Sequence, residues 1–307
     1  MRVYVTGATG FVGRGVVTAL SDAGHSVVGL VRGKAPAATG NVAYVQGAIT
    51  DTAPESLAEG MTGCDAVIHL VGIIAEERGA GQTFERVHVG GTRTVIEAAK
   101  RANAGNTRFV YVSAIGADLS AKSEYSRTKA EAETMTRQSG LPWTIFRPSL
   151  IFAPGAQFLA QMEDLIQKPP LSPFPLPFIP VPGDGQNRFQ PVYLGDLARC
   201  ITDCLTNPQT ANTLYSIGGA DETTFNELLV AIAAKLGVKK PLFHAPMPVM
   251  FAAASVLESV LPRPPITTDQ LQNLGRDNVC DNAPLRAAFG IAPLGWDAIL
   301  SLCYPDR

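Results

Sequence analysis

The sequence predicts an α/β protein built on a doubly wound parallel sheet with helices on both faces, followed by a smaller C-terminal lobe. Three observations support this fold class. Apolar strand-like segments alternate with helical stretches, a glycine-rich turn joins the first strand to the first helix, and the alternation stops at a proline-rich stretch. A length of 307 residues with 46% apolar content is enough for one large domain and an appended lobe.

Six segments have the character of strands in one sheet. Near-continuous apolar runs such as AVIHLV are typical of strands that are buried on both faces. Helical stretches or crossovers follow the first five, as parallel pairing requires. The expected strands span residues 3–5, 26–31, 43–46, 66–71, 108–113 and 143–147.

The pattern breaks after Pro148. Residues 168–183 contain seven prolines, so they can form neither a helix nor a central strand. Further on, residues 191–205 have helical spacing and are expected to return to the first domain. The expected division is therefore a first domain of residues 1–152 with 189–206, and a smaller lobe of residues 153–188 with 207–307.

The beginning of the lobe's second part carries a clear local signal. Residues 214–219 are expected to form a strand and residues 224–236 a helix. Thr224 and Glu227 have the spacing of a capping box at the start of that helix.

Charge and composition exclude several classes of function. The net charge is −2 without any run of like charges, which argues against nucleic acid as a partner and against an electrostatic hold on anionic lipid. No window has the eighteen or so uncharged apolar residues of a membrane span, and a strand at residue 2 leaves no room for a targeting peptide, so a cytoplasmic protein is expected. Five cysteines without metal-ligand spacing predict buried thiols and no metal site.

The turn TGATGFVG predicts a dinucleotide site. Gly7 allows the tight turn, Gly10 allows a pyrophosphate to approach the helix N-terminus, and Gly13 allows the helix to pack closely on the strand. Thr9, Phe11 and Val12 would complete the contact. The alternative is a glycine turn that binds no ligand, but a strand before the turn and a helix after it favour the cofactor.

The end of the second strand bears on which cofactor binds. Arg32 stands nineteen residues after Gly13, where an acidic side chain would hold the ribose of NAD(H). A guanidinium can clamp a 2'-phosphate, with Lys34 as a second charge, so NADP(H) is favoured and NAD(H) is the alternative. The structural alternative is a solvated surface arginine. Ala48 and Ile49, after the third strand, would lie beside the adenine.

Tyr125 and Lys129 are four residues apart in a stretch rich in helix formers, so both project from one helical face. A neighbouring ammonium lowers the pKa of a phenol from its usual value of about 10, which makes the hydroxyl a usable acid or base. The pair follows the fifth expected strand, where ligands approach such sheets. It therefore predicts a catalytic site.

Several of these segments together resemble the extended short-chain dehydrogenase/reductase family. Within that family the resemblance is to the atypical branch that includes the dehydrogenase-like accessory subunit of respiratory complex I and bacterial proteins described as nucleoside-diphosphate-sugar epimerase-like. The segments that carry it are TGATGFVG at 6–13, FERVHVGGT at 84–92, SAIGA at 113–117, YSRTK at 125–129, FRPS at 146–149, QPVYLGDLA at 190–198 and ITTDQLQNLGRDNV at 266–279.

The resemblance implies a Rossmann fold, a nicotinamide cofactor at the carboxyl ends of the strands, Tyr125 as acid/base and Lys129 on the nicotinamide ribose. It also implies cofactor contacts from Leu70, Val71 and Gly72. The remaining implied cofactor contacts are Val112 and Pro148.

Two positions depart from the family pattern. Where typical members place a Ser or Thr that polarises the substrate carbonyl, this chain has Ala114, so Ser113 is the candidate replacement. Where they place an Asn, it has His88, which we interpret as a packed or capping residue rather than a catalytic one. His69, within an apolar strand, is interpreted as a satisfied core residue.

Two apolar segments remain unassigned. The proline-rich segment 169–182, with Phe174, Leu176, Phe178 and Ile179, and segment 246–261 would either pack within the lobe or contact a hydrophobic partner or a membrane surface. Two functions therefore stand: a reductase or epimerase-like enzyme that uses Tyr125, Lys129 and Ser113 on an unidentified small-molecule substrate, and a non-catalytic, cofactor-stabilised structural or regulatory subunit. Ala114 favours the second function, and the Tyr125–Lys129 pair favours the first.

Overall fold

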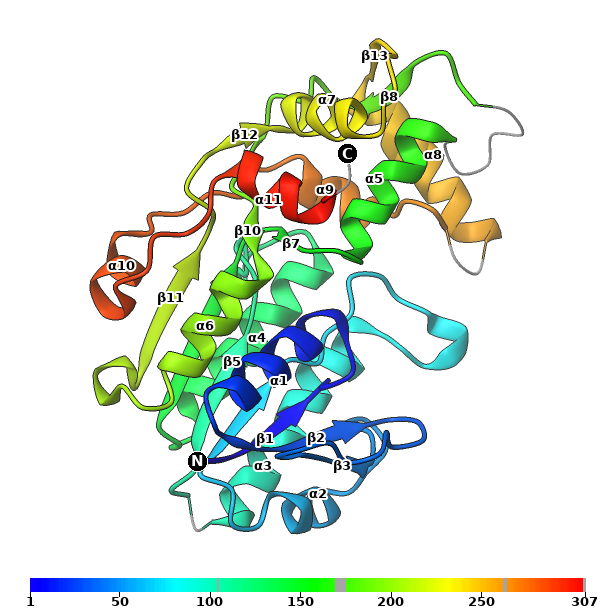
Figure 1. The fold of residues 1–307 in the computed structure, drawn as a ribbon. Helices are drawn as coiled ribbons and strands as arrows, with labels where there is room; N and C mark the ends of the chain where they lie inside the picture. Colours follow the sequence, from blue (N-terminus) through cyan, green and yellow to red (C-terminus); the bar gives the residue numbers. More distant parts are fainter. Residues whose placement is uncertain (104, 169–174, 262–263, 306–307) are drawn as a thin grey trace. The chain divides into compact units, whose positions relative to one another are not determined.

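A computed structural model describes residues 1–103, 105–168, 175–261 and 264–305. The chain divides into two compact units, the first made of Met1–Pro148, Leu194–Ile217 and Asn282–Ile291. Its core is a seven-stranded parallel sheet in the order β11-β6-β5-β4-β1-β2-β3 (Figure 1). The strands are β1 (Arg2–Thr6), β2 (Ser26–Val31), β3 (Val42–Gln46), β4 (Ala66–His69), β5 (Arg108–Val112), β6 (Trp143–Pro148) and β11 (Thr213–Ile217).

Helices cover both faces of this sheet. On one face α1 packs against α6, while α2, α3 and α4 lie over the other, where their apolar side chains join those of the strands in the core (Figure 1). The helices are α1 (Phe11–Asp22), α2 (Pro54–Met61), α3 (Gly91–Ala102), α4 (Glu124–Gln138), α6 (Leu194–Asp203) and α10 (Ala283–Phe289). The doubly wound parallel sheet predicted from the sequence is confirmed.

The strand order positions the site. The chain starts at β1, in the interior of the sheet, moves outward through β2 and β3, and then crosses to β4 on the other side of β1. Strand order therefore reverses at β1 and β4. In open parallel sheets a crevice forms at the carboxyl ends of the strands at such a switch point.

The structure assigns the edge strand β11 to the first unit, which differs from the expected division of the chain. Residues 207–217 were expected in the smaller lobe, but β11 pairs in parallel with β6 and belongs to the first unit. The Arg108 guanidinium donates to the hydroxyls of Thr144 and Thr210 at 2.6 and 2.8 Å, and the Thr144 hydroxyl donates to the Thr210 carbonyl at 2.9 Å. These long-range hydrogen bonds hold the segment before β11 beside β6, and no local sequence pattern encodes them.

The second unit comprises Ser149–Tyr193, Gly218–Asp281 and Ala292–Arg307. Three two-stranded sheets join its segments: β7 (Ile151–Phe152) with β10 (Val192–Tyr193), β9 (Arg188–Phe189) with β12 (Thr223–Thr224), and β8 (Ile179–Pro182) with β13 (Leu242–Ala245). Its helices are α5 (Gln157–Gln167), α7 (Phe225–Lys235), α8 (Met247–Val260), α9 (Thr268–Leu274) and α11 (Trp296–Cys303).

Several local features of this unit can be compared with the sequence. The capping box of Thr224 and Glu227 is present at the start of α7. The proline-rich segment contains β8, whereas Phe174 and its neighbours from 169 on lie outside the described residues. Of the five cysteines, Cys64, Cys200 and Cys204 are buried and the other two are half-buried, and all five are free thiols. Within the described ranges, no helix has the length and apolar character needed to cross a bilayer.

Candidate cofactor and catalytic site

The glycine turn between β1 and α1 is built so that side chains are excluded. Gly7 has a φ of 73°, in the left-handed region, and its carbonyl accepts the Gly10 amide at 2.9 Å. A Cβ on Gly13 would lie 2.0 Å from the Gly7 carbonyl oxygen, so only glycine permits this approach of helix to strand. A Cβ on Gly10 would lie 3.2 Å from the same oxygen, which is a much milder contact.

The start of α1 is open to an anionic group. Gly10 is the N-cap residue and supplies no side-chain cap, and the first turn has no acidic residue. Thr9 and Gly10 are exposed, and Phe11 and Val12 are half-buried. The amides and partial positive charge of a helix N-terminus suit a pyrophosphate. The residues present therefore fit a dinucleotide at this turn.

Two arginines lie near the ends of β1 and β2. Arg32 is exposed, and its guanidinium donates to the Gln82 side-chain oxygen at 3.3 Å. Arg14, on the first turn of α1, donates to the Thr9 carbonyl at 3.0 Å. Arg14 has no distinctive sequence signal beyond its place directly after Gly13.

The segment after β3 is tied down by its own contacts. The Ala48 amide donates to the Thr52 hydroxyl at 2.9 Å, and Ile49 is buried against Gly91 at the start of α3. Asp51 forms an ion pair with Arg86. Ala48, half-buried, is thus the accessible member of the two residues expected beside the adenine, whereas Ile49 is part of the core.

Lys129 lies at the carboxyl end of β5. It extends from α4, its ammonium donates to the Val112 carbonyl at 3.0 Å, and the same Nζ lies 5.0 Å from the centre of the Tyr111 ring. The side chain is 4% exposed, and burial lowers the pKa of Lys129 from 10.5 to about 8. Burying an ammonium costs free energy, and groups with strongly shifted pKa values tend to gather at functional sites.

The loop after β4 passes over this ammonium. A Cβ on Gly72 would lie 3.2 Å from Lys129 Nζ and 3.5 Å from His88 Nε2. Val71 lies against Gly7, and the Leu70 amide donates to the Thr6 hydroxyl at 3.3 Å. The structure therefore brings Gly7, residues 70–72 and Lys129 together at the carboxyl ends of β1, β4 and β5.

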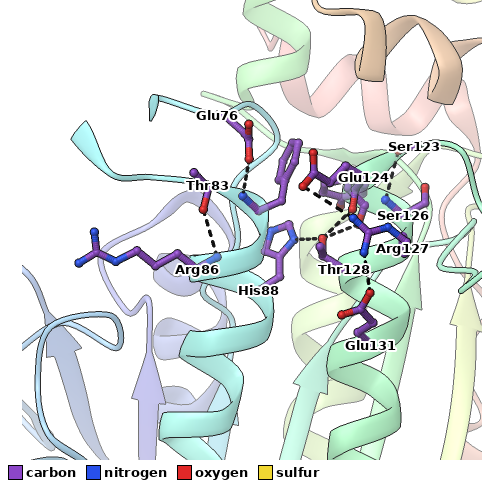
Figure 2. A network of polar contacts seen from close by, with 12 residues as sticks. Glu76, Thr83, Arg86, His88, Ser123, Glu124, Ser126, Arg127, Thr128 and Glu131 are labelled. Carbon is purple, nitrogen blue, oxygen red and sulfur yellow. Dashed lines mark hydrogen bonds and ion pairs between the residues drawn. The ribbon is translucent and has the colours of Figure 1, made fainter. Parts of the chain in front are cut away.

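His88 is locked between this loop and α4. It lies on a π-helical turn, Glu85–Gly90, a type of turn frequent at functional sites. Its Nδ1 is 3.0 Å from the Thr128 hydroxyl, and that hydroxyl is 2.8 Å from the Glu124 carbonyl. Its Nε2 is 3.1 Å from both the amide nitrogen and the carbonyl oxygen of Ile73. Figure 2 shows the bond to Thr128.

His88 is therefore an uncharged packed residue. Burial, followed by the charge of Lys129, lowers the pKa of His88 well below its ordinary value. In β4, His69 is similar: it is fully buried between the hydroxyls of Thr6 and Thr92 at 2.7 and 3.0 Å, and its pKa is lowered to about 3. Both histidines satisfy their ring nitrogens within the protein, as the sequence analysis expected of His69.

Tyr125 projects from the first turn of α4 and is half-buried. Its ring contacts His88 and Phe84 edge to face, with centroids 5.5 and 5.8 Å apart. The Ser123 hydroxyl caps α4 by accepting the Ser126 amide (Figure 2). The cap and the two rings fix the start of the helix, and Lys129 lies one turn further along it.

Ser113 follows β5, next to Ala114. Its amide donates to the Phe146 carbonyl at 2.7 Å, and its hydroxyl is buried with no partner among the described residues. A buried hydroxyl without a partner carries a desolvation cost and is a candidate ligand contact. Ala114 is half-buried and offers only a methyl group.

Behind α4, a buried carboxylate supports the helix. Glu133 is 1% exposed and accepts two hydrogen bonds from the Arg147 guanidinium at 2.7 Å and one from Arg137 at 3.0 Å. The bidentate bond joins α4 to β6, which ends at the buried Pro148. Sequence reasoning missed this pair: Glu133 was one acid among several in the helix, and only the fold places Arg147 opposite it.

Comparisons with known proteins agree with this geometry. Residues 7–158 match the family model described as NAD(P)H-binding. A relative from Arabidopsis thaliana, NADH dehydrogenase (ubiquinone) 1 alpha subcomplex subunit 9, mitochondrial, is 28% identical and aligns over 91% of this chain and 71% of its own length. The ceramide reductase of Caulobacter vibrioides is also 28% identical, over 84% of this chain and 77% of its own. In the solved structure of MoeE5 in complex with UDP-glucose and NAD, the fold is shared with a TM-score of 0.75 at 19% identity, over 99% of this chain and 98% of that one.

Proposed function

Because the chain belongs to the atypical branch of the extended short-chain dehydrogenase/reductase family, we propose that it is an NADP(H)-dependent reductase or epimerase-like enzyme with Tyr125 as acid/base. One observation carries the proposal. The buried ammonium of Lys129 lies at the carboxyl end of a central strand, one helical turn after Tyr125 and beneath the loop after β4.

The roles of the two residues follow from their positions. The Lys129 ammonium donates one hydrogen bond to the Val112 carbonyl, and its two other N–H groups can donate to the nicotinamide ribose. Its positive charge favours the ionised form of a neighbouring phenol, so the Tyr125 hydroxyl can give or take a proton near neutral pH. The bound nicotinamide would supply or accept the hydride.

The preference for NADP(H) rests on Arg32 and Lys34. An exposed guanidinium at the end of β2 can meet a 2'-phosphate with two hydrogen bonds, and no acidic side chain follows β2 to hold a free ribose hydroxyl. Arg14 brings a second guanidinium to the glycine turn. The remaining proposed cofactor contacts are the glycine turn with Thr9, Phe11 and Val12, then Ala48, Leu70, Val71, Gly72, Val112 and Pro148.

For the substrate, we propose an apolar carbonyl compound. The relative named ceramide reductase supports this class, and Ser113, with its buried unpartnered hydroxyl, would donate to the carbonyl in place of Ala114. Losing a donor of this kind typically costs about 10²- to 10³-fold in rate. An enzyme that lacked both donors would therefore be slow.

The proposal is tested in two steps. Native mass spectrometry of protein purified without added nucleotide should show a retained NADP(H). Turnover is then followed as NADPH oxidation with a long-chain 3-ketone and, separately, as conversion of UDP-glucose. Tyr125→Phe should remove turnover while calorimetric affinity for NADPH stays within a few-fold, because only the hydroxyl is lost. Turnover that survives this change would show that another group is the acid.

A second function is favoured by a specific observation. Ala114 leaves the usual donor position without a polar group, and the Arabidopsis relative is named as a subunit of NADH dehydrogenase. On this proposal the chain binds NADP(H) as a structural or regulatory subunit and catalyses nothing. Ala114→Ser distinguishes the two functions: it should raise the rate of an enzyme, whereas the subunit would bind the cofactor and remain inactive in both forms.

A further inference from the structure

The Lys129 ammonium lies over an aromatic face. Its Nζ is 5.0 Å from the centre of the Tyr111 ring, within the distance of about 6 Å at which the negative face of a ring attracts a cation. Both side chains are buried, so solvent does little to screen this attraction. Because cation–π contacts are stronger when desolvated, the ring can offset part of the cost of burying the ammonium.

The other contacts of this ammonium are few. It donates one hydrogen bond to the Val112 carbonyl, and Gly72 brings the loop after β4 close to it, because a Cβ there would lie 3.2 Å from Nζ. Glu133 attracts the ammonium from one turn further along α4, but its carboxylate is bonded to two guanidinium groups. Apart from the Val112 carbonyl, the Tyr111 ring is therefore the compensating group that the described residues place against the ammonium.

A neighbouring strand holds the ring in place. His69, which is opposite Tyr111 in the parallel register of β4 and β5, stacks on it with ring centroids 5.6 Å apart. The two ring nitrogens of His69 lie 2.7 and 3.0 Å from the hydroxyls of Thr6 and Thr92. Burial lowers the pKa of His69 to about 3, so the stack adds no positive charge beside Lys129.

The hydroxyl of Tyr111 does not explain its place beside the lysine. The hydroxyl is buried and has no hydrogen-bond partner among the described residues. Burial raises its pKa well above the ordinary value, so it carries no negative charge that could attract the ammonium. The group that Lys129 meets is therefore the ring face, and a phenylalanine at this position would present a similar face.

We propose that Tyr111 is a positioning residue, whose ring face holds the Lys129 ammonium in its charged form at the carboxyl end of β5, where the proposed function needs it to meet the nicotinamide ribose. The inference rests on that proposed function and deepens it. Tyr111 acts through Lys129, because a lysine that loses its proton has one donor fewer for the ribose and no charge.

Several titratable groups surround Lys129 besides Tyr111. They are Glu133 and Tyr125 on α4, His88 on the π-helical turn and His69 on β4. Burial keeps both histidines neutral. Because an activity profile would combine all these groups, the signal of the lysine itself is the sharper measurement.

Nuclear magnetic resonance with isotope-labelled lysine side chains follows this titration without cofactor. The Lys129 signal is identified by its absence in Lys129→Met, and in wild type it should titrate at a pH of about 8. Tyr111→Leu should titrate about one pH unit lower or more, because a desolvated cation–π contact is lost. Tyr111→Phe should restore the wild-type titration. A Tyr111→Leu curve that coincides with wild type would overturn the proposal.

The matched control is Phe109→Leu. Phe109 is a fully buried ring on the same strand and in the same core, and it lies near His69, with centroids 6.3 Å apart. Its loss should leave the Lys129 titration unchanged. An equal shift in this control would show that loosening of the core lowers the pKa, and the proposal would be wrong.

A second variant covers the case in which Tyr111→Leu misfolds. A fluorinated phenylalanine at position 111 keeps the shape of the ring but weakens its negative face, so it should lower the pKa of Lys129 in the same direction. An unchanged pKa with this ring would equally overturn the proposal. Circular dichroism verifies the folding of each variant.

Cofactor binding separates this inference from the proposed function. In calorimetry with NADPH from neutral to alkaline pH, the affinity of Tyr111→Leu should fall about one pH unit below that of wild type, while Phe109→Leu follows wild type. If wild type binds no NADPH at any pH, the proposed function fails, and the cofactor role of Tyr111 fails with it. If NADPH binds with the same pH dependence in wild type and Tyr111→Leu, only the present inference is overturned.

Discussion

Two regions differ in which side chains they bury. We call the place where α4 packs beside the carboxyl end of β5 the corner, and it buries polar side chains, whereas helix α8 in the second unit exposes apolar ones. At the corner, Lys129, His88 and Glu133 are almost fully buried, and each has hydrogen-bond partners within the protein. On α8 the situation is reversed, with valines in solvent, and the carboxylate of Glu258 accepts the Thr268 amide. Burial of the Lys129 ammonium costs stability, whereas exposed apolar side chains such as those of α8 are common on protein surfaces.

The largest effect should come from breaking the buried ion pair behind α4. Glu133→Ala leaves Arg147 half-buried without its bidentate partner and should lower the free energy of unfolding by about 3–5 kcal/mol. Urea unfolding measures it. The control is Asp277→Ala, which breaks an exposed pair with Arg188 and should cost much less. Similar losses for both would mean that the Glu133 site is solvated.

Lys129 should make stability depend on alkaline pH. Its pKa is lowered to about 8 in the folded chain but lies near 10.5 in the unfolded chain, so the unfolded chain binds the extra proton in between. This lysine therefore costs stability below pH 8, and the cost, about 3 kcal/mol, disappears as pH rises from about 8 to 10.5. Without cofactor, the difference between Lys129→Met and wild type should shrink over that range. Lys100→Met, a change at an exposed lysine of α3, is the matched control.

The next effect concerns the cofactor. Arg32→Asp should weaken NADPH binding about ten- to a hundred-fold, because a charge-assisted contact of about 1.5–3 kcal/mol is lost, while NADH binding changes little or improves. Calorimetry with both cofactors decides it. Arg199→Asp, an exposed arginine on α6, is the control and should leave both affinities unchanged. Equal wild-type affinity for the two cofactors would contradict the assignment to Arg32.

The two regions also differ in how far the sequence could predict them. The glycine turn and the parallel strands β1 to β6 could be predicted as segments, because local spacing and apolar runs encode them. The place of β11 and the Glu133–Arg147 pair could not, because both depend on contacts between distant segments. For His88, the sequence showed a departure from the family pattern, but neither its bonds to Ile73 and Thr128 nor the burial that lowers its pKa. For segment 246–261, apolar residues at helical spacing favoured packing within the lobe, whereas Val249, Val256 and Val260 are exposed.

The smallest change in the free energy of unfolding should come from a substitution on α8. A small change there would show that the exposed valines of α8 do not pack within the protein. Val260→Asp changes a 72% exposed side chain, so the free energy of unfolding should stay within about 0.5 kcal/mol of wild type. The same change at a buried apolar position would cost several kcal/mol, because a charge would lose its water. Thermal and urea unfolding without lipid make the comparison. A loss above about 2 kcal/mol would mean that these valines pack within the protein, and the contrast between corner and helix would disappear.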